Sequence, residues 1–163
     1  MADYRIQGFQ PGTIGRVTEL HGRYYSSHWG LDTRFEAEVA RDMAEFMTRF
    51  DPHLDGIWVA VRDGEILGSI TIDGTGTEGP DARLRWFIID EAGHGLGIGK
   101  RLMEEAMAHC ARAKFESVFL WTFAGLDAAR HLYETWGFQL TESFEDKDWG
   151  DPVIHQRFDK SMP

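Results

Sequence analysis

The stretch HGLGIGKRLM, residues 94–103, carries three glycines in five positions, followed by two cations and then apolar residues. An apolar run, WFII at 86–89, precedes it, and an amphipathic helical pattern follows it. Glycines at a strand-to-helix junction let backbone N–H groups approach an anion, and the helix N-terminus adds a favourable partial charge. The stretch therefore predicts an anion-binding turn between a strand and a helix.

Two well-known phosphate-binding motifs do not fit this stretch. A dinucleotide-binding Gly-x-Gly-x-x-Gly that starts at Gly95 would need glycine where Lys100 stands. A nucleoside-triphosphate loop would need glycine in place of His94 and a hydroxyl residue in place of Arg101. A tight turn that uses glycine only for its positive φ remains an alternative reading of these residues.

The hydrophobic periodicity predicts an α/β fold with the element order β-α-α-β-β-β-α-β-α-β-β. A hairpin turns at Asp63-Gly64, and the later strands and helices alternate, which indicates parallel pairing around the glycine-rich turn. We expect a mixed sheet with helices on both faces. The elements are expected at 4–9, 11–29, 32–50, 57–73 (the hairpin), 82–90, 98–113, 117–123, 126–136, 138–144 and 153–159.

Length and charge limit the classes of function. The 163 residues predict a single domain over 1–163, and the net charge of −10 argues against nucleic-acid or anionic-membrane partners. The acidic total weakly favours a cationic acceptor, unless a local patch outweighs it. One cysteine, Cys110, and no apolar signal-like segment indicate a cytoplasmic protein, and the histidine spacing predicts no metal site.

Two motifs resemble those of the GNAT acyl-CoA N-acyltransferases. The family's pyrophosphate loop, Gln/Arg-x-x-Gly-x-Gly/Ala, maps onto His94, Gly97 and Gly99, with histidine in place of the usual Gln or Arg. The stretch AARHLYETWGF (128–138) is similar to the family's Ala-x-x-Leu-Tyr-Glu-x-x-Gly-Phe. The chain also resembles the acetyltransferase half of MarR-type regulator–GNAT fusion proteins, in FEAEVARDMAEF, FLWTF and SFEDKDWGDPVIHQRF.

The resemblance implies a GNAT-like, mostly antiparallel sheet of six to seven strands that binds acetyl-CoA (coenzyme A). The end of the fourth strand would pair with the pantetheine arm, and backbone N–H groups from His94 to Lys100 would cradle the pyrophosphate. Tyr133 matches the tyrosine that commonly protonates the departing thiolate, although a simple packing role remains open. Leu126 stands where the family often has an asparagine that contacts pantetheine. The implied cofactor-binding residues are Phe87, Ile88, Ile89, His94, Gly95, Leu96, Gly97, Ile98, Gly99 and Lys100.

In this family the first two helices wall the acceptor site. Their aromatic junction either lines that site or simply covers the sheet, with Asp148 and Trp149 closing the site from the last loop. The base is open among His21, His28 and Glu36, because the fourth strand begins with Arg83 and Arg85 rather than a carboxylate. The expected acceptor-site residues are Tyr24, Tyr25, His28, Trp29 and Trp149.

The resemblance predicts an acetyl-CoA-dependent N-acetyltransferase that acts on a primary amine of a small molecule or peptide. Transfer would be direct, without a covalent enzyme intermediate, and the family also allows a homodimer. The alternative is a catalytically weak domain that binds acyl-CoA as a sensor or interaction module.

Overall fold

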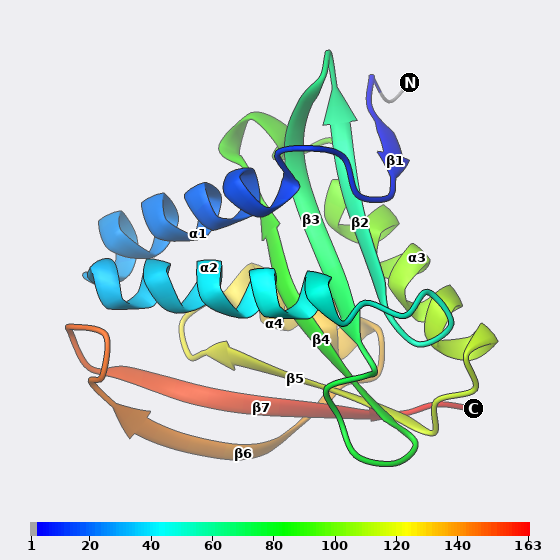
Figure 1. The fold of residues 1–163 in the computed structure, drawn as a ribbon. Coiled ribbons are helices and arrows are strands. Elements are labelled where there is room, and N and C mark those ends of the chain that lie inside the picture. Colours follow the sequence, from blue (N-terminus) through cyan, green and yellow to red (C-terminus); the bar gives the residue numbers. More distant parts are fainter. Residues whose placement is uncertain (1–2) are drawn as a thin grey trace.

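A computed structural model describes residues 3–163 as one seven-stranded sheet with helices on both faces (Figure 1). The strand order is β1-β2-β3-β4-β5-β7-β6, and each neighbouring pair is antiparallel except β4 with β5. This architecture confirms the predicted mixed sheet and its single region of parallel pairing. The strands are β1 (Arg5–Gln7), β2 (Gly56–Arg62), β3 (Glu65–Asp73), β4 (Asp81–Ile89), β5 (Ser117–Phe123), β6 (Gln139–Asp146) and β7 (Val153–Ser161).

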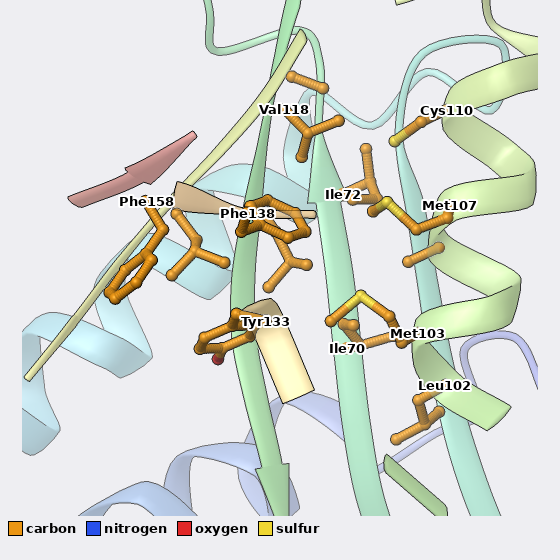
Figure 2. Packing of buried hydrophobic residues seen from close by; sticks show 14 of the residues in the cluster. Ile70, Ile72, Leu102, Met103, Met107, Cys110, Val118, Tyr133, Phe138 and Phe158 are labelled. Atoms are coloured by element: carbon orange, nitrogen blue, oxygen red, sulfur yellow. The ribbon is translucent and has the colours of Figure 1, made fainter. Parts of the chain in front are cut away.

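Two helices cover each face of the sheet. On one face lie α1 (Thr13–Trp29) and α2 (Thr33–Thr48), and on the other α3 (Ile98–Arg112) and α4 (Asp127–Thr135). Figure 2 shows the α3 side of the core, where Leu102, Met103, Met107 and Cys110 of the helix lie beside β3. Among residues 3–163, no helix is both long and apolar enough to cross a membrane.

Several predicted boundaries move by one to three residues for local reasons. Helix α1 begins at Thr13 rather than residue 11, because Gly12 adopts a φ of 94° and Thr13 Oγ1 donates to Gln10 O at 2.6 Å. Helix α2 is capped by Asp32, whose side chain accepts from the Arg34 amide at 2.9 Å. The first strand is shorter than predicted, and both closing strands extend further along their shared register.

The parallel strands β4 and β5 stay together for only half of their length. They pair from Asp81 with Ser117 to Leu84 with Leu120. Beyond these residues β4 continues along β3 as far as Ile89, whereas β5 continues along β7. Among residues 3–163, no strand therefore pairs with the outer backbone edge of the last residues of β4, at the carboxyl end of the two parallel strands.

A bulge in β4 lies at the point where the two strands separate. Ser69 pairs with Ile88, but Thr71 pairs with Arg85, so β4 carries one extra residue between them. Trp86 has a φ of 47°, which is uncommon for a residue with a side chain. Bulges increase local twist and redirect side chains. This one accompanies the departure of β4 from β5.

Candidate active site

Two connected pockets occupy the space between the separated strands. The glycine-loop pocket, of about 530 Å³, lies among the end of β4, residues 93–99, α1 and α4. The aromatic pocket, of about 260 Å³, lies deeper, between α1, α2 and the middle of the sheet. Four residues line both pockets: Tyr25, Phe87, Thr122 and Tyr133.

The glycine loop owes its shape to backbone conformation. Gly95 and Gly97 have φ values of 79° and 76°, and a Cβ on either would meet no atom within 4 Å. Glycine is therefore favoured there by the left-handed conformation and not by crowding. Gly99 differs, because its Cβ would lie 3.1 Å from Ile89 Cδ1, so this glycine allows α3 to approach β4.

The first turn of α3 presents unpaired amides at this loop. Gly97 caps the helix without a side-chain hydrogen bond, and the first bond into the helix runs from the Arg101 amide to Gly97 O at 3.2 Å. The amides of residues 98–100 therefore have no partner within the helix. The His94 amide differs, since it donates to Glu91 O at 3.1 Å. The His94 amide is therefore not free for the expected pyrophosphate contact.

Eight of the ten predicted cofactor-binding residues line the glycine-loop pocket. They are Phe87, Ile88, Ile89, His94, Gly95, Gly97, Ile98 and Gly99. Leu96 instead packs against the core, and its carbonyl accepts from the Tyr4 hydroxyl at 3.2 Å. The Lys100 side chain is exposed and lies outside the lining. Leu126, at the position of the family's asparagine, is a lining residue.

Tyr133 lies where the two pockets meet. Its ring packs between Phe87 and Phe158, with centroid separations of 6.0 and 6.2 Å, and its exposed fraction is 5%. In Figure 2 its hydroxyl oxygen points away from Phe138, and no hydrogen bond within residues 3–163 uses that hydroxyl. Burial raises the pKa of the hydroxyl above its usual value of 10. Tyr133 therefore keeps its proton at neutral pH.

The aromatic pocket contains part of the predicted acceptor set. Tyr25 and Trp149 both line it, and their ring centroids lie 5.0 and 5.2 Å from that of Phe35. Tyr24 lines the glycine-loop pocket instead. Two predicted residues lie outside both linings: His28, which is exposed and stacks on Tyr24 at 4.4 Å, and Trp29, which packs against Phe123.

The candidate bases differ in whether they line a pocket. Glu36 is exposed above Gly22 of α1 and lies outside both pockets. His21 lines the aromatic pocket, and its Nδ1 donates to Val17 O at 2.8 Å. Burial lowers the pKa of His21 to about 4, so it is neutral at pH 7 and a weak base.

His155 is a lining residue of the aromatic pocket that the sequence reasoning missed. Its Nε2 lies 2.9 Å from Asp146 Oδ2 on β6, in a close contact whose angle does not make a hydrogen bond. The ring stacks on Phe144 at 4.7 Å. The alternation of β7 could have found it, because Val153, His155 and Arg157 share the face that carries α1 and α2.

A third, charged pocket of about 450 Å³ continues from the aromatic pocket toward the start of β4. Its centre is Asp73, whose oxygens lie 2.8 Å from Arg49 Nη1 and 3.1 Å from Arg85 Nη1. Hydrogen bonds from both arginines lower the pKa of Asp73 despite its burial. Arg83 and Arg85, which the sequence placed at the start of this strand, line both the aromatic and the charged pocket.

Comparison with known proteins agrees with this geometry. Residues 15–138 match the model of the acetyltransferase (GNAT) family, which is more than half of the chain. The chain belongs to the GNAT family. Acetyl-CoA is the acetyl donor of this family, and the unpaired amides and open glycines beside β4 fit a pyrophosphate and a pantetheine arm.

Curated GNAT relatives carry different acceptors in their names. A mycothiol acetyltransferase of Geodermatophilus obscurus is 34% identical over 150 residues, which cover 89% of this chain and 47% of that protein. The N-acetylaspartate synthetase of Rattus norvegicus is 32% identical over 122 residues, covering 72% and 39%. The chain thus spans less than half the length of these two relatives.

A solved structure shows the same fold as this GNAT chain. The yncA protein of Salmonella typhimurium, solved with its cofactor acetyl-CoA, superimposes with a TM-score of 0.74. The match covers 99% of this chain and 95% of that one, at 14% sequence identity. At that identity the likeness supports the fold alone.

Proposed function

We propose that the chain is an acetyl-CoA-dependent N-acetyltransferase that acetylates a primary amine of a small molecule or peptide. The observation that carries this proposal is the position of Tyr133, whose buried side chain lines both the glycine-loop pocket and the aromatic pocket. A donor in the first pocket and an amine in the second would meet at this hydroxyl. A transferase without a covalent intermediate requires such juxtaposition of the two reactants.

The donor would lie along β4 and the glycine loop. The β4 edge beyond Leu84, which has no strand partner, offers N–H and C=O groups to the amides of a pantetheine arm. The amides of residues 98–100, with those of the loop after His94, would hold the pyrophosphate. Leu126 would contribute an apolar contact in place of the family's asparagine.

Three chemical roles fall to residues around the junction. Acetyl-CoA supplies the thioester, whose C–S bond breaks as the C–N bond to the amine forms. Tyr133 donates its proton to the departing sulfur, and a backbone N–H at or just after the β4 bulge stabilises charge on the carbonyl oxygen. His155, which lines the aromatic pocket beside Asp146, would take a proton from the amine. The products are the acetylated amine and the free CoA thiol.

Several finer expectations remain predictions under this proposal. They are a single domain over residues 1–163, a cytoplasmic location, a homodimer, and the relationship to the acetyltransferase half of MarR-type fusion proteins. The acceptor also stays open, because the two curated relatives are named for chemically different acceptors. The alternative of a CoA-binding sensor without transfer would use the same glycine-loop pocket.

Two measurements together test the proposed function. Acetyl-CoA should raise the melting temperature, since a ligand that binds the native state stabilises it. Amine-dependent release of free CoA thiol should then appear with a panel of amino acids, peptides, polyamines and aminoglycosides. A melting-temperature rise without thiol release for any amine would favour the sensor. The absence of any rise at saturating acetyl-CoA would contradict both readings.

A further inference from the structure

Arg83 lies on β4 before the bulge and lines both the aromatic and the charged pocket. Within residues 3–163, no carboxylate lies within 4 Å of its guanidinium, and none of the hydrogen bonds uses it. Its Nε is buried without a partner. A partly buried cation in a cleft is thus left without a counter-ion from the chain.

The other three arginines of the charged pocket each have a carboxylate. Arg49 and Arg85 share Asp73, at 2.8 and 3.1 Å, and Arg85 also approaches Asp42 at 3.6 Å. Arg157 pairs with Asp159 at 2.9 Å. Asp73 and Asp42 are therefore engaged by other arginines, and within residues 3–163 Arg83 is the arginine of this lining without a carboxylate within 4 Å, although Glu78 and Asp81 also line the pocket.

An unmatched cation at this depth is costly unless a ligand neutralises it. Burial and the neighbouring Arg85 lower the pKa of Arg83 to about 10, so the guanidinium stays charged at neutral pH. Its planar fork of N–H donors matches a carboxylate in a bidentate geometry, which an amine or a hydroxyl cannot supply.

We propose that Arg83 binds a carboxylate of the acceptor, so that the acceptor is an amino acid or a short peptide with a free carboxylate. The inference rests on the proposed function and names the substrate class of the same site. It replaces the weak expectation of a cationic amine, which came from the total charge of −10. Inside the pocket, the guanidinium of Arg83 rather than the total charge of the chain would face the ligand.

The aromatic pocket sets the arrangement of such an acceptor, because Arg83 and Tyr133 both line it. The carboxylate would lie toward the start of β4, and the amine toward the junction. Phe87, at the junction, follows Arg83 by four residues on β4, and the bulge lies between them, so a stretch of β4 separates the two. The arginine side chain covers part of that distance, and the acceptor, flanked by the rings of Tyr25 and Trp149, would cover the rest.

The first test compares paired acceptors on the full chain. Each of a set of amino acids and dipeptides is assayed beside its carboxamide, which keeps the amine but removes the negative charge, with spermidine as a cationic amine. We expect kcat/KM, from thiol release, to be about 10- to 100-fold higher for the carboxylates, as for a charge-assisted pair. Equal use of carboxylates and carboxamides, or preference for spermidine, would overturn the inference.

The second test assigns this preference to Arg83. Arg83→Gln should raise KM for the carboxylates by about 10- to 100-fold and leave the carboxamides unchanged, whereas Arg83→Lys should fall between Gln and wild type. Arg23→Gln, an exposed arginine on α1, is the matched control and should change neither. An equal loss for carboxylates and carboxamides, with the acetyl-CoA melting shift retained, would contradict a role in carboxylate binding.

A binding measurement separates this inference from the proposed function. Calorimetry with the CoA-saturated protein should show that the amino acids bind more tightly than their carboxamides, and that Arg83→Gln removes the difference. Such binding without any turnover would uphold the inference and overturn the enzyme proposal. Turnover without a carboxylate preference would uphold the enzyme proposal and overturn the inference. Neither turnover nor carboxylate-dependent binding would overturn both.

Discussion

The hydroxyl of Ser69 on β3 donates a hydrogen bond of 2.9 Å to the carbonyl of Trp86, the residue of the β4 bulge with a φ of 47°. Ser69 is fully buried, and this bond fixes the peptide group where β4 leaves β5. The strained conformation at Trp86 costs free energy that the surrounding contacts must offset. The bulge therefore depends on a side chain from the neighbouring strand.

Ser69→Ala should destabilise the fold and disturb the cleft. Loss of the donor leaves the Trp86 carbonyl without its partner, at a cost of about 1–3 kcal/mol in unfolding free energy by urea titration. We expect kcat to fall more than acetyl-CoA binding, because the bulge lies beside the reacting atoms and the glycine loop does not depend on it. Ser27→Ala, which removes an exposed hydroxyl on α1, should leave both unchanged. Wild-type stability in Ser69→Ala would contradict this role.

Gly97→Ala should weaken the anion cradle through the backbone. Open space surrounds a Cβ at this position, but its φ of 76° costs a non-glycine residue about 1–2 kcal/mol. The loop amides would then turn away from the pyrophosphate, so acetyl-CoA should raise the melting temperature less than in wild type. Gly15→Ala is the control, because this exposed helix position also has open space and should gain up to about 1 kcal/mol. If acetyl-CoA raised the melting temperature of Gly97→Ala as much as that of wild type, the loop would not be part of the donor site.

Tyr133→Phe should separate binding from transfer. The ring still fills the core beside Phe138 and Phe158, but the proton donor at the junction is lost. We expect kcat to fall by about 100-fold or more, as for other general acids, while the melting shift with acetyl-CoA stays near that of wild type. Unchanged turnover would assign Tyr133 to packing alone.

The free energy of unfolding should fall as the pH is lowered through the range in which His21 titrates. Burial lowers the pKa of His21 in the folded protein to about 4, against 6.5 for a free histidine. Between these two pH values the unfolded chain binds more protons than the folded protein does. The stabilising effect of the buried, neutral His21 is therefore complete above pH 6.5 and is lost as the pH falls toward 4. From pH 7 to pH 5, wild type should lose roughly 2 kcal/mol more than His21→Gln.

Urea titrations at the two pH values measure this difference. His53→Gln, which removes an exposed histidine outside the core, should retain the wild-type dependence. Parallel pH profiles for wild type and His21→Gln would show that His21 titrates as a free histidine.

The glycine loop and the packing of the elements were predictable from local patterns. Periodicity located the helices and strands to within a few residues, and Asp63-Gly64 forms the predicted turn. These features depend on neighbours in sequence. The Ala-x-x-Leu-Tyr-Glu pattern likewise singled out Tyr133, which the fold places between the two pockets.

The acceptor side was less predictable because it depends on contacts between distant strands. The sequence did not reveal that β5 leaves β4 after Leu120, nor that Asp73 is engaged by Arg49 and Arg85. Without the pairing of Asp73 with Arg49 and Arg85, nothing in the sequence distinguished Arg83 from the other arginines. His155 was missed for the same reason, since the pairing of β6 with β7 brings Asp146 to it.

The central claim is that Tyr133 joins a donor pocket to an acceptor pocket, and a crystal structure of the chain with acetyl-CoA tests it most directly. The account predicts the thioester sulfur within hydrogen-bonding distance of the Tyr133 hydroxyl, about 3.5 Å for an O–H to sulfur contact. It also predicts the pyrophosphate at the amides that follow His94. A thioester that lies away from Tyr133, or a pyrophosphate outside the glycine loop, would contradict it.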